Sequence, residues 1–138
     1  MYKVLVDSSI FVDFMFHREP FYKASSRVME LCEDKVVKGY ITTSILMDLH
    51  YIFKKMSRSN KDADLAIQEI LKVFKVIDIS GKDIDASTKV HRKDFEEAVI
   101  EECSIRNELD YIVTRNVKDF QGKHINIVLP DELLSKFQ

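Results

Sequence analysis

The sequence has few cysteines and no long apolar run, and each shortage excludes a class of protein. Its two cysteines, Cys32 and Cys103, lie far apart and form no Cys-x-x-Cys pair, which excludes a disulfide framework and a zinc cluster and indicates a reduced intracellular protein. No segment approaches the ~20 apolar residues that span a bilayer. The N-terminus also lacks a charged leader followed by an apolar segment. We therefore expect a cytoplasmic protein without a membrane partner.

The chain also lacks a strong charge of either sign. Its 138 residues carry a net charge of −2, and 46% of them are hydrophobic and 32% charged, which is ordinary for a globular protein. Any polyanionic partner must therefore be held by local basic patches. The length favours one domain with its own core, and no repeat, linker or low-complexity tract divides it. We expect residues 1–138 to form a single domain.

Strand-like and helical segments alternate along the chain. Short apolar runs predict strands over 3–6, 39–43, 76–79, 110–114 and 125–129. Helical spacing and start signals predict helices over 9–16, 21–34, 44–55, 60–75, 82–92, 94–108 and 130–137. This alternation predicts an α/β protein, a three-layer α/β/α domain with a mostly parallel sheet.

Polar and acidic residues follow two of the predicted strands. The segment KVLVDSSIF runs from a strand into Asp7 and Ser8, and DYIVTRNVKDF runs from another into Thr114, Asn116 and Asp119. Ligands gather at the carboxyl ends of parallel strands, so one interpretation is a functional site. The other interpretation is local, because Asp is a favoured helix cap and Asp and Asn are ordinary loop residues.

Two further aspartates lie on predicted helices. The buried face of the 44–55 helix is predicted to consist of Ile45, Leu49, Ile52 and Met56. Asp48 falls on that face, where a carboxylate is costly unless it is paired, holds a metal or reaches the exposed rim. Asp94 begins a later helix and forms a capping-box pattern with Glu97. It can therefore be either a helix cap or a member of a functional site.

The four aspartates can meet at one edge of the predicted sheet. Clustered carboxylates repel one another, and a bound divalent cation usually neutralises this repulsion. A set of oxygen ligands without His or Cys suits Mg²⁺ or Mn²⁺ rather than zinc. The pattern therefore outlines a metal-dependent phosphoryl-transfer site.

The sequence resembles a PIN domain, the small metal-dependent ribonuclease fold of many VapC-type toxins, over essentially its full length. The segments that carry the resemblance are VLVDSSIFVDF, TTSILMDL, KDFEEAV and IVTRNVKDF. The resemblance implies a catalytic and metal-binding quartet with polar supports: Asp7, Asp48, Asp94 and Asp119, supported by Ser8, Thr114 and Asn116. Two positions depart from the family pattern, because the second acid is usually Glu and many relatives carry Asp where Asn116 stands.

The function that this resemblance implies is a Mg²⁺- or Mn²⁺-dependent ribonuclease acting on single-stranded RNA. An antitoxin protein and a homodimer are the expected partners. Basic residues near the acids are predicted to hold phosphates: Lys54, Lys55, Arg58, Lys89, Arg92, Lys93, Arg115 and Lys118. The alternative for each of them is a solvated charged face.

Three other interpretations of the sequence compete with a PIN nuclease. A haloacid-dehalogenase phosphatase needs a second Asp two residues after the first, where this chain has Ser9. A phospho-receiver domain is disfavoured because the third strand leads into Ile79, Ser80 and Gly81 rather than an acceptor Asp. A catalytically weakened PIN-like module that binds RNA or protein stays open. The apolar first helix, residues 10–16, is either core or a seat for a partner helix or a second subunit.

Overall fold

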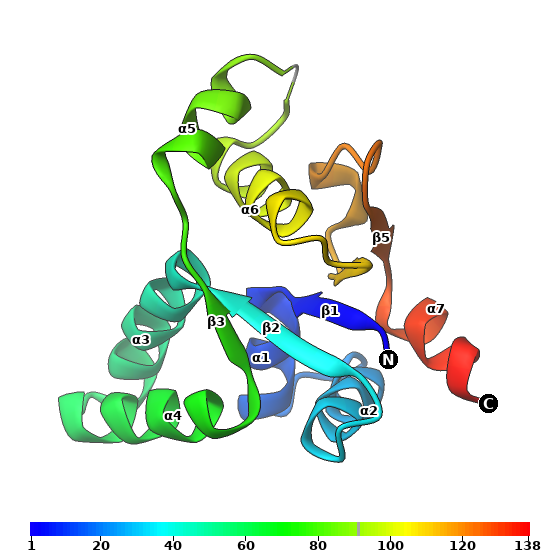
Figure 1. Cartoon of the computed structure of the whole chain (residues 1–138). Coiled ribbons are helices and arrows are strands. Elements are labelled where there is room, and N and C mark those ends of the chain that lie inside the picture. Colours follow the sequence, from blue (N-terminus) through cyan, green and yellow to red (C-terminus); the bar gives the residue numbers. More distant parts are fainter. Residues whose placement is uncertain (91) are drawn as a thin grey trace.

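A parallel sheet forms the centre of the computed structural model, which describes residues 1–90 and 92–138 (Figure 1). The strands are β1 (Lys3–Val6), β2 (Lys38–Thr42), β3 (Lys75–Ile77), β4 (Tyr111–Val113) and β5 (Asn126–Val128). They lie in the order β3-β2-β1-β4-β5, and every neighbouring pair is parallel. The predicted parallel α/β fold is confirmed.

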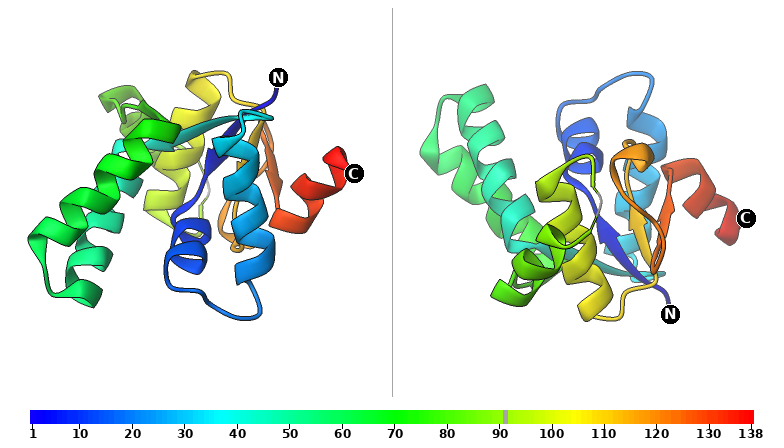
Figure 2. Two further views of the ribbon diagram at one scale, coloured as in Figure 1. Left: turned by 90° about the horizontal axis from the view of Figure 1, so that it is seen from below. Right: turned by 90° about the horizontal axis from the view of Figure 1, so that it is seen from above.

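Helices cover both faces of the sheet. The α-helices are α1 (Ser8–Met15), α2 (Tyr22–Glu33), α3 (Thr43–Ser57), α4 (Asn60–Val73), α5 (Gly81–Thr88), α6 (Phe95–Arg106) and α7 (Pro130–Leu134). Helices α1 to α4 lie on one face and α5 and α6 on the other, as the opposite views of Figure 2 show. Helix pairs α1–α2, α3–α4 and α5–α6 pack against each other. Among the described helices, none has the length and apolar character to cross a bilayer.

The turn between α3 and α4 is encoded locally. Arg58 ends α3 in the left-handed region, with φ 58°. The Ser59 hydroxyl then accepts a hydrogen bond from the Asp62 backbone N–H at 3.1 Å and so caps α4. At the other end of α3, the Thr42 hydroxyl accepts from Ile45 N–H at 3.2 Å. These caps place the start of α3 directly at the carboxyl end of β2.

The chain order creates a switch point at the centre of the sheet. Strands β2 and β3 lie on one side of β1, and β4 and β5 on the other. The crevice at the carboxyl ends of β1 and β4 is therefore where a ligand site is expected in an open α/β sheet. Val6 pairs with Val113 at this end, so the next residues, Asp7 and Thr114, emerge side by side. The fully buried β1 residues Val4, Leu5 and Val6 hold this edge in the core.

Three details of the predicted elements are wrong. Strand β3 ends at Ile77 rather than 79, because the Ile79 N–H donates to the Thr43 hydroxyl at 3.2 Å. Helix α5 ends at Thr88 rather than 92, where the Thr88 hydroxyl donates to the Asp85 carbonyl; residue 91 of that prediction lies outside the described residues.

The third detail is the buried face of α3. It runs through Ile45, Leu49 and Phe53, at a spacing of four residues, while Ile52 is half-buried and Met56 is 58% exposed. The sequence pattern included Met56 because its apolar side chain continues the helical spacing of the buried residues. Met56 lies in the last turn of α3, where the helix is exposed.

The first testable consequence concerns Gly39 in β2. A methyl group at this buried position would lie 2.7 and 2.8 Å from ring carbons of Phe74 and 3.0 Å from Cys32 Sγ. Gly39→Ala should therefore lower the free energy of unfolding by about 1–3 kcal/mol through overpacking. Urea denaturation measures this. Gly81→Ala is the control, since nothing lies within 4 Å of its added methyl group, and should change stability by no more than ~0.5 kcal/mol. Equal effects of the two substitutions would contradict the packing at Gly39.

Candidate active site

The Asp7 carboxylate lies at the switch point and is 2% exposed. Its Oδ2 atom accepts a hydrogen bond from the Thr114 hydroxyl at 2.7 Å. The same Thr114 oxygen accepts from the Asn116 backbone N–H at 3.0 Å. The Asp7 N–H donates to the Val113 carbonyl at 3.1 Å. This relay fixes the orientation of the Asp7 carboxylate by groups from both central strands.

The second Asp7 oxygen has no such support. Oδ1 is buried without a hydrogen-bond partner among the described residues. Burial raises the pKa of Asp7 above its usual range, against the lowering effect of the Thr114 hydroxyl and the Ser8 backbone N–H, and the charges of Asp119 and Asp48 raise this pKa further. A buried unpaired carboxylate oxygen is costly unless a proton or a cation occupies its free position.

The first turn of α6 brings two more acids to this edge, Glu96 and Glu97. The Asp94 carboxylate caps α6 by accepting the Glu97 N–H at 2.9 Å. Within the described part of the chain, Glu97 makes no return bond, so the predicted capping box is only half formed. Burial raises the pKa of Glu97 to about 8, and the charges of Asp7 and Asp94 contribute. A hydrogen bond that protonated Glu96 donates to Asp48 raises the pKa of Glu96 to about 7.

The structure thus brings the four predicted aspartates into one electrostatic cluster. Its members are Asp7, Asp48, Asp94, Glu96, Glu97 and Asp119, which we call the acid cluster. Asp48 is exposed at the rim of α3, where the predicted buried face ends. Asp119 lies half-buried in the short 3₁₀ helix η1 (Val117–Asp119).

The acid cluster fits a divalent cation in donor type and in charge. Every donor is an oxygen, Asp7 Oδ1 is buried and unpaired, and mutual repulsion raises several pKa values. Over residues 1–90 and 92–138, however, no three His, Cys, Asp or Glu side chains already stand close enough together to hold a metal. The residues therefore supply the chemistry of a Mg²⁺ or Mn²⁺ site without a preassembled shell.

Arg115 has a different place from the one predicted for it. Its Nε donates to Asp13 Oδ2 at 2.6 Å and its Nη2 to Asp13 Oδ1 at 3.0 Å, and its guanidinium lies 4.0 Å from the centre of the Phe21 ring. Asp13 is fully buried and also accepts from the Ser25 hydroxyl at 3.1 Å. The expected phosphate contact of Arg115 is thus replaced by an ion pair that ties the loop after β4 to α1.

The other basic residues fall into three places. Lys54, Lys55 and Arg58 lie at the C-terminal end of α3, with Lys55 roughly 10 Å along the helix axis from Asp48. Lys89 forms an ion pair with Asp85 at 2.8 Å. Only the third group is adjacent to the acid cluster, because a cleft beside Asp119 is lined by Arg92, Lys93 and Lys118.

The family model of the PIN domain matches residues 3–118, which include both central strands and most of the acid cluster. The chain belongs to the PIN-domain family. The predicted resemblance is therefore confirmed. No curated protein sequence matches the chain.

Solved structures share the fold of this PIN domain at low sequence identity. VapBC2 from Rickettsia felis, bound to a promoter DNA fragment, is similar with a TM-score of 0.68 and 17% identity, covering 92% of this chain and 98% of that one. A toxin–antitoxin complex from Klebsiella pneumoniae has a TM-score of 0.67 and 21% identity, with 92% and 97% covered. The sarcin-ricin-loop cleaving toxin VapC20 from Mycobacterium tuberculosis has a TM-score of 0.60 and 12% identity, with 88% and 92% covered.

Sequence reasoning missed two acids of this PIN domain, Glu96 and Glu97. Their signal was present in the sequence, because both acids lie in the first turn of the helix that Asp94 caps. Asp13 and Glu101 were also missed, and their buried carboxylates hold the loops that carry the site. No local pattern marks them, since their partners are about a hundred and about twenty residues away.

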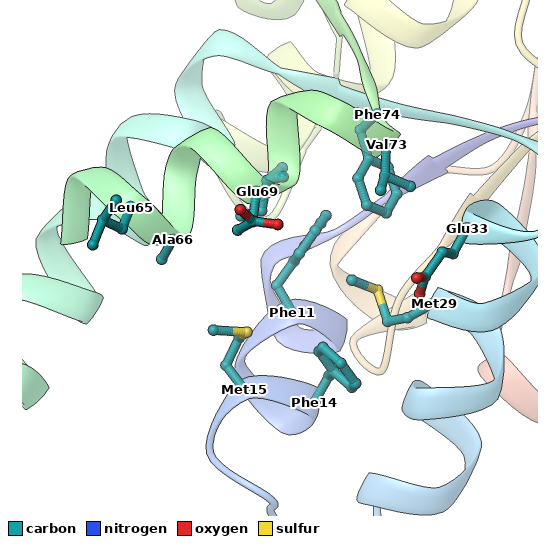
Figure 3. Close-up of a pocket in the computed structure, with 11 residues that line it drawn as sticks. Phe11, Phe14, Met15, Met29, Glu33, Leu65, Ala66, Glu69, Val73 and Phe74 are labelled. Atoms are coloured by element: carbon teal, nitrogen blue, oxygen red, sulfur yellow. The ribbon is translucent and has the colours of Figure 1, made fainter. Parts of the chain in front are cut away.

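A separate apolar groove lies between α1, α2 and α4 of the PIN domain (Figure 3). Its volume is about 340 Å³. Figure 3 shows Phe11, Phe14 and Met15 projecting from α1 toward the groove. Met15 is 44% and Leu65 49% exposed, whereas Ile10 and Phe11 are fully buried. The first helix is therefore mostly core, as one of its two predicted interpretations required, with an exposed apolar edge.

The raised pKa values give a pH dependence of stability with a definite sign. Above pH ~5 the unfolded chain has released the protons of both glutamates, since an unfolded Glu titrates near ~4.3, whereas the folded chain keeps a proton on Glu96 up to about pH 7 and on Glu97 up to about pH 8. The free energy of unfolding without metal should therefore fall as the pH rises through this range. Urea denaturation in EDTA at several pH values measures the slope.

Glu97→Gln should flatten this dependence, because it removes the group with the higher of these two pKa values. Glu102→Gln on the same helix, outside the acid cluster, is the matched control and should leave the slope as it is in the parent. A parent chain whose stability rises from pH 5 to 8 would contradict the burial of Glu97.

Proposed function

We propose that this PIN domain is a Mg²⁺- or Mn²⁺-dependent ribonuclease that cuts single-stranded RNA in the cytoplasm, as the toxin of a toxin–antitoxin pair. The observation that carries the proposal is the buried Asp7 carboxylate with one unpaired oxygen, held at the switch point among other acids. Family membership supports a nuclease, and one similar structure is that of a toxin named for cleaving the sarcin-ricin loop.

In this proposal, Asp7, Glu97 and Asp119 hold the cation, with Asp48 and Glu96 at the rim. When bound, the cation supplies charge neutralisation at a phosphodiester and a water of lowered pKa. Thr114, positioned by the Asn116 N–H, engages Oδ2 of Asp7 and leaves Oδ1 free to bind the cation.

Proton transfer falls to the rim of the acid cluster. The hydrogen bond with Asp48 raises the pKa of Glu96 to about 7, which suits Glu96 to accept the proton of the attacking water. The Asn116 side chain supports the orientation of that water. Asp94 acts as the helix cap that presents Glu97.

The alternative is a catalytically weakened PIN module that binds RNA or protein without cutting. Two observations favour it. Asp48 is exposed and shorter than the usual Glu, and no preassembled group of three ligands exists in the described residues. Metal-dependent cleavage by the pure protein decides between the two functions.

Metal dependence is the first test of the nuclease. Mn²⁺ or Mg²⁺ should raise the melting temperature of the pure chain, because a ligand present at 100 times its Kd stabilises the folded state by about 2.7 kcal/mol. The same ions should be required for RNA cleavage, and excess EDTA should abolish it. Undiminished cleavage in EDTA, after exclusion of contaminating nucleases, would overturn the mechanism.

Three variants test which acids act. Asp7→Asn and Glu97→Gln should remove most cleavage while the fold persists, because each removes a ligand charge. Asp119→Asn should cost less, about 10–100-fold, if it acts through water. Asp94→Asn is the matched comparison, since Asn caps a helix as well as Asp. If Asp94→Asn is inactive and Glu97→Gln active, the roles of these two residues are reversed.

We further propose that the apolar groove of Figure 3 seats an amphipathic helix of an antitoxin. The groove offers exposed apolar side chains from two helices, Met15 on α1 and Leu65 on α4. A helix with an apolar face buries such side chains when it lies in a hydrophobic groove. Similar structures are described as toxin–antitoxin complexes, which supports this class of partner.

Leu65→Glu tests this groove. The chain co-expressed with the product of the adjacent gene should bind that protein, and Leu65→Glu should weaken binding more than tenfold by calorimetry. Tyr51→Glu, at an exposed hydrophobic position on α3 outside the groove, should bind like the parent. Sedimentation of the chain alone measures its oligomeric state. If the chain is a homodimer and Leu65→Glu dissociates it, the groove binds a second copy of the chain rather than an antitoxin.

A further inference from the structure

A basic cleft of about 230 Å³ opens beside the acid cluster. Asp119 belongs to both, so the cleft continues directly from the candidate active site. One wall comes from the segment before α6 and the other from η1 and the loop after it. Its cationic residues are Arg92, Lys93, Lys118 and Lys123.

The four cations of the basic cleft lack acidic partners. Among the described residues, none of them lies within 4.0 Å of a carboxylate oxygen, whereas Lys89 and Arg106 do. All four are exposed at their positions. In a chain with a net charge of −2, this is a local concentration of positive charge. Such a concentration raises the local density of a polyanion and steers it toward the neighbouring site.

The wall that carries Lys123 is anchored. The Glu101 carboxylate is 4% exposed and accepts the Gln121 and Gly122 backbone N–H groups at 2.8 Å each. Gly122 has a φ of 69°, which allows the turn that presents both N–H groups to one side chain. These two hydrogen bonds to one side chain fix Gln121 and Gly122, and with them the backbone next to Lys123, to α6. This wall of the basic cleft is therefore held in place by the fold.

An exposed aromatic side chain, Phe95, contacts one cation of the basic cleft and lies next to two acids of the acid cluster in the sequence. Phe95, the first residue of α6, is 43% exposed and directly precedes Glu96. The Arg92 guanidinium lies 4.9 Å from the centre of its ring. An exposed ring with a cation against it is the kind of platform on which unpaired bases stack, and it is sequence-tolerant.

We infer that the basic cleft is the subsite for the backbone of single-stranded RNA on the Asp119 side of the acid cluster. Lys118, Lys123 and Lys93 contact successive phosphates, and a base stacks against Phe95 with Arg92. Duplex RNA fits poorly, because its paired bases cannot reach the ring. The inference rests on the proposed function for its choice of RNA, although binding at the cleft is measurable without cleavage.

The test is the salt dependence of RNA binding by the full chain. A short labelled single-stranded RNA is titrated in EDTA, its integrity checked on a denaturing gel, and anisotropy is followed at several salt concentrations. Lys118→Ala/Lys123→Ala should reduce the slope of log K against log salt by about 1.4, that is about 0.7 for each lost phosphate contact. Affinity at low salt should fall about tenfold.

The matched control is Lys38→Ala/Lys75→Ala, which removes the same charge from the exposed amino ends of β2 and β3, at the opposite edge of the sheet from Asp7. It should leave the slope close to that of the parent. Equal losses in both double variants would mean diffuse attraction and would overturn the subsite. An unchanged slope in Lys118→Ala/Lys123→Ala would overturn it as well.

Phe95 is tested separately from the charges. Phe95→Leu keeps an apolar side chain but removes the stacking surface, so affinity for single-stranded RNA should fall about tenfold with an unchanged salt slope. Phe95→Tyr should restore it. Preference for duplex RNA, or for single-stranded DNA over RNA, would contradict the assigned ligand. A chain that binds as described but does not cut in Mg²⁺ would refute the nuclease and leave the subsite standing.

Discussion

The hydrogen bond from the Thr114 hydroxyl to the Asp7 carboxylate is the contact on which the site depends. It joins the residues that follow β1 and β4, the two strands that flank the switch point. Asp7 is buried because the strand before it is buried, so its charge cannot be solvated by moving outward. The protein gives Oδ2 a hydrogen bond and leaves Oδ1 without a partner. Burying the carboxylate is therefore costly, but the carboxylate is held in one orientation with one oxygen free.

The charge distribution around that contact is strongly uneven. Five acids of the acid cluster gather on one side of Asp119, and four cations without acidic partners, within the described residues, gather on the other. Their near cancellation explains why the net charge gives no hint of a polyanion partner. The stability of the sheet and helices outweighs the repulsion within each group. Stability and function therefore act in opposite directions along this edge.

Much of this arrangement could be predicted from the sequence. The runs before Asp7 and Thr114 are short and apolar, which predicts the two strands. The polar residues that follow each run predict where the candidate site lies. The sequence could not tell which of Asp94 and Glu97 is the helix cap and which belongs to the site. Both roles require an acid at the start of a helix, and only the side-chain directions distinguish them. Asp13 and Glu101 were invisible for a different reason: their partners are set by the tertiary fold rather than by neighbouring residues.

Helix α1 has three tasks within eight residues. It starts beside Asp7, its Phe11, Phe14 and Met15 line the apolar groove, and its Asp13 holds Arg115 in the loop that carries Asn116. These contacts lie on different sides of one short helix, so few positions of α1 can change without loss of one of them. A lineage that changes its binding partner must do so mainly through the exposed groove residues of α2 and α4, such as Glu33, Leu65 and Glu69, while α1 stays nearly constant.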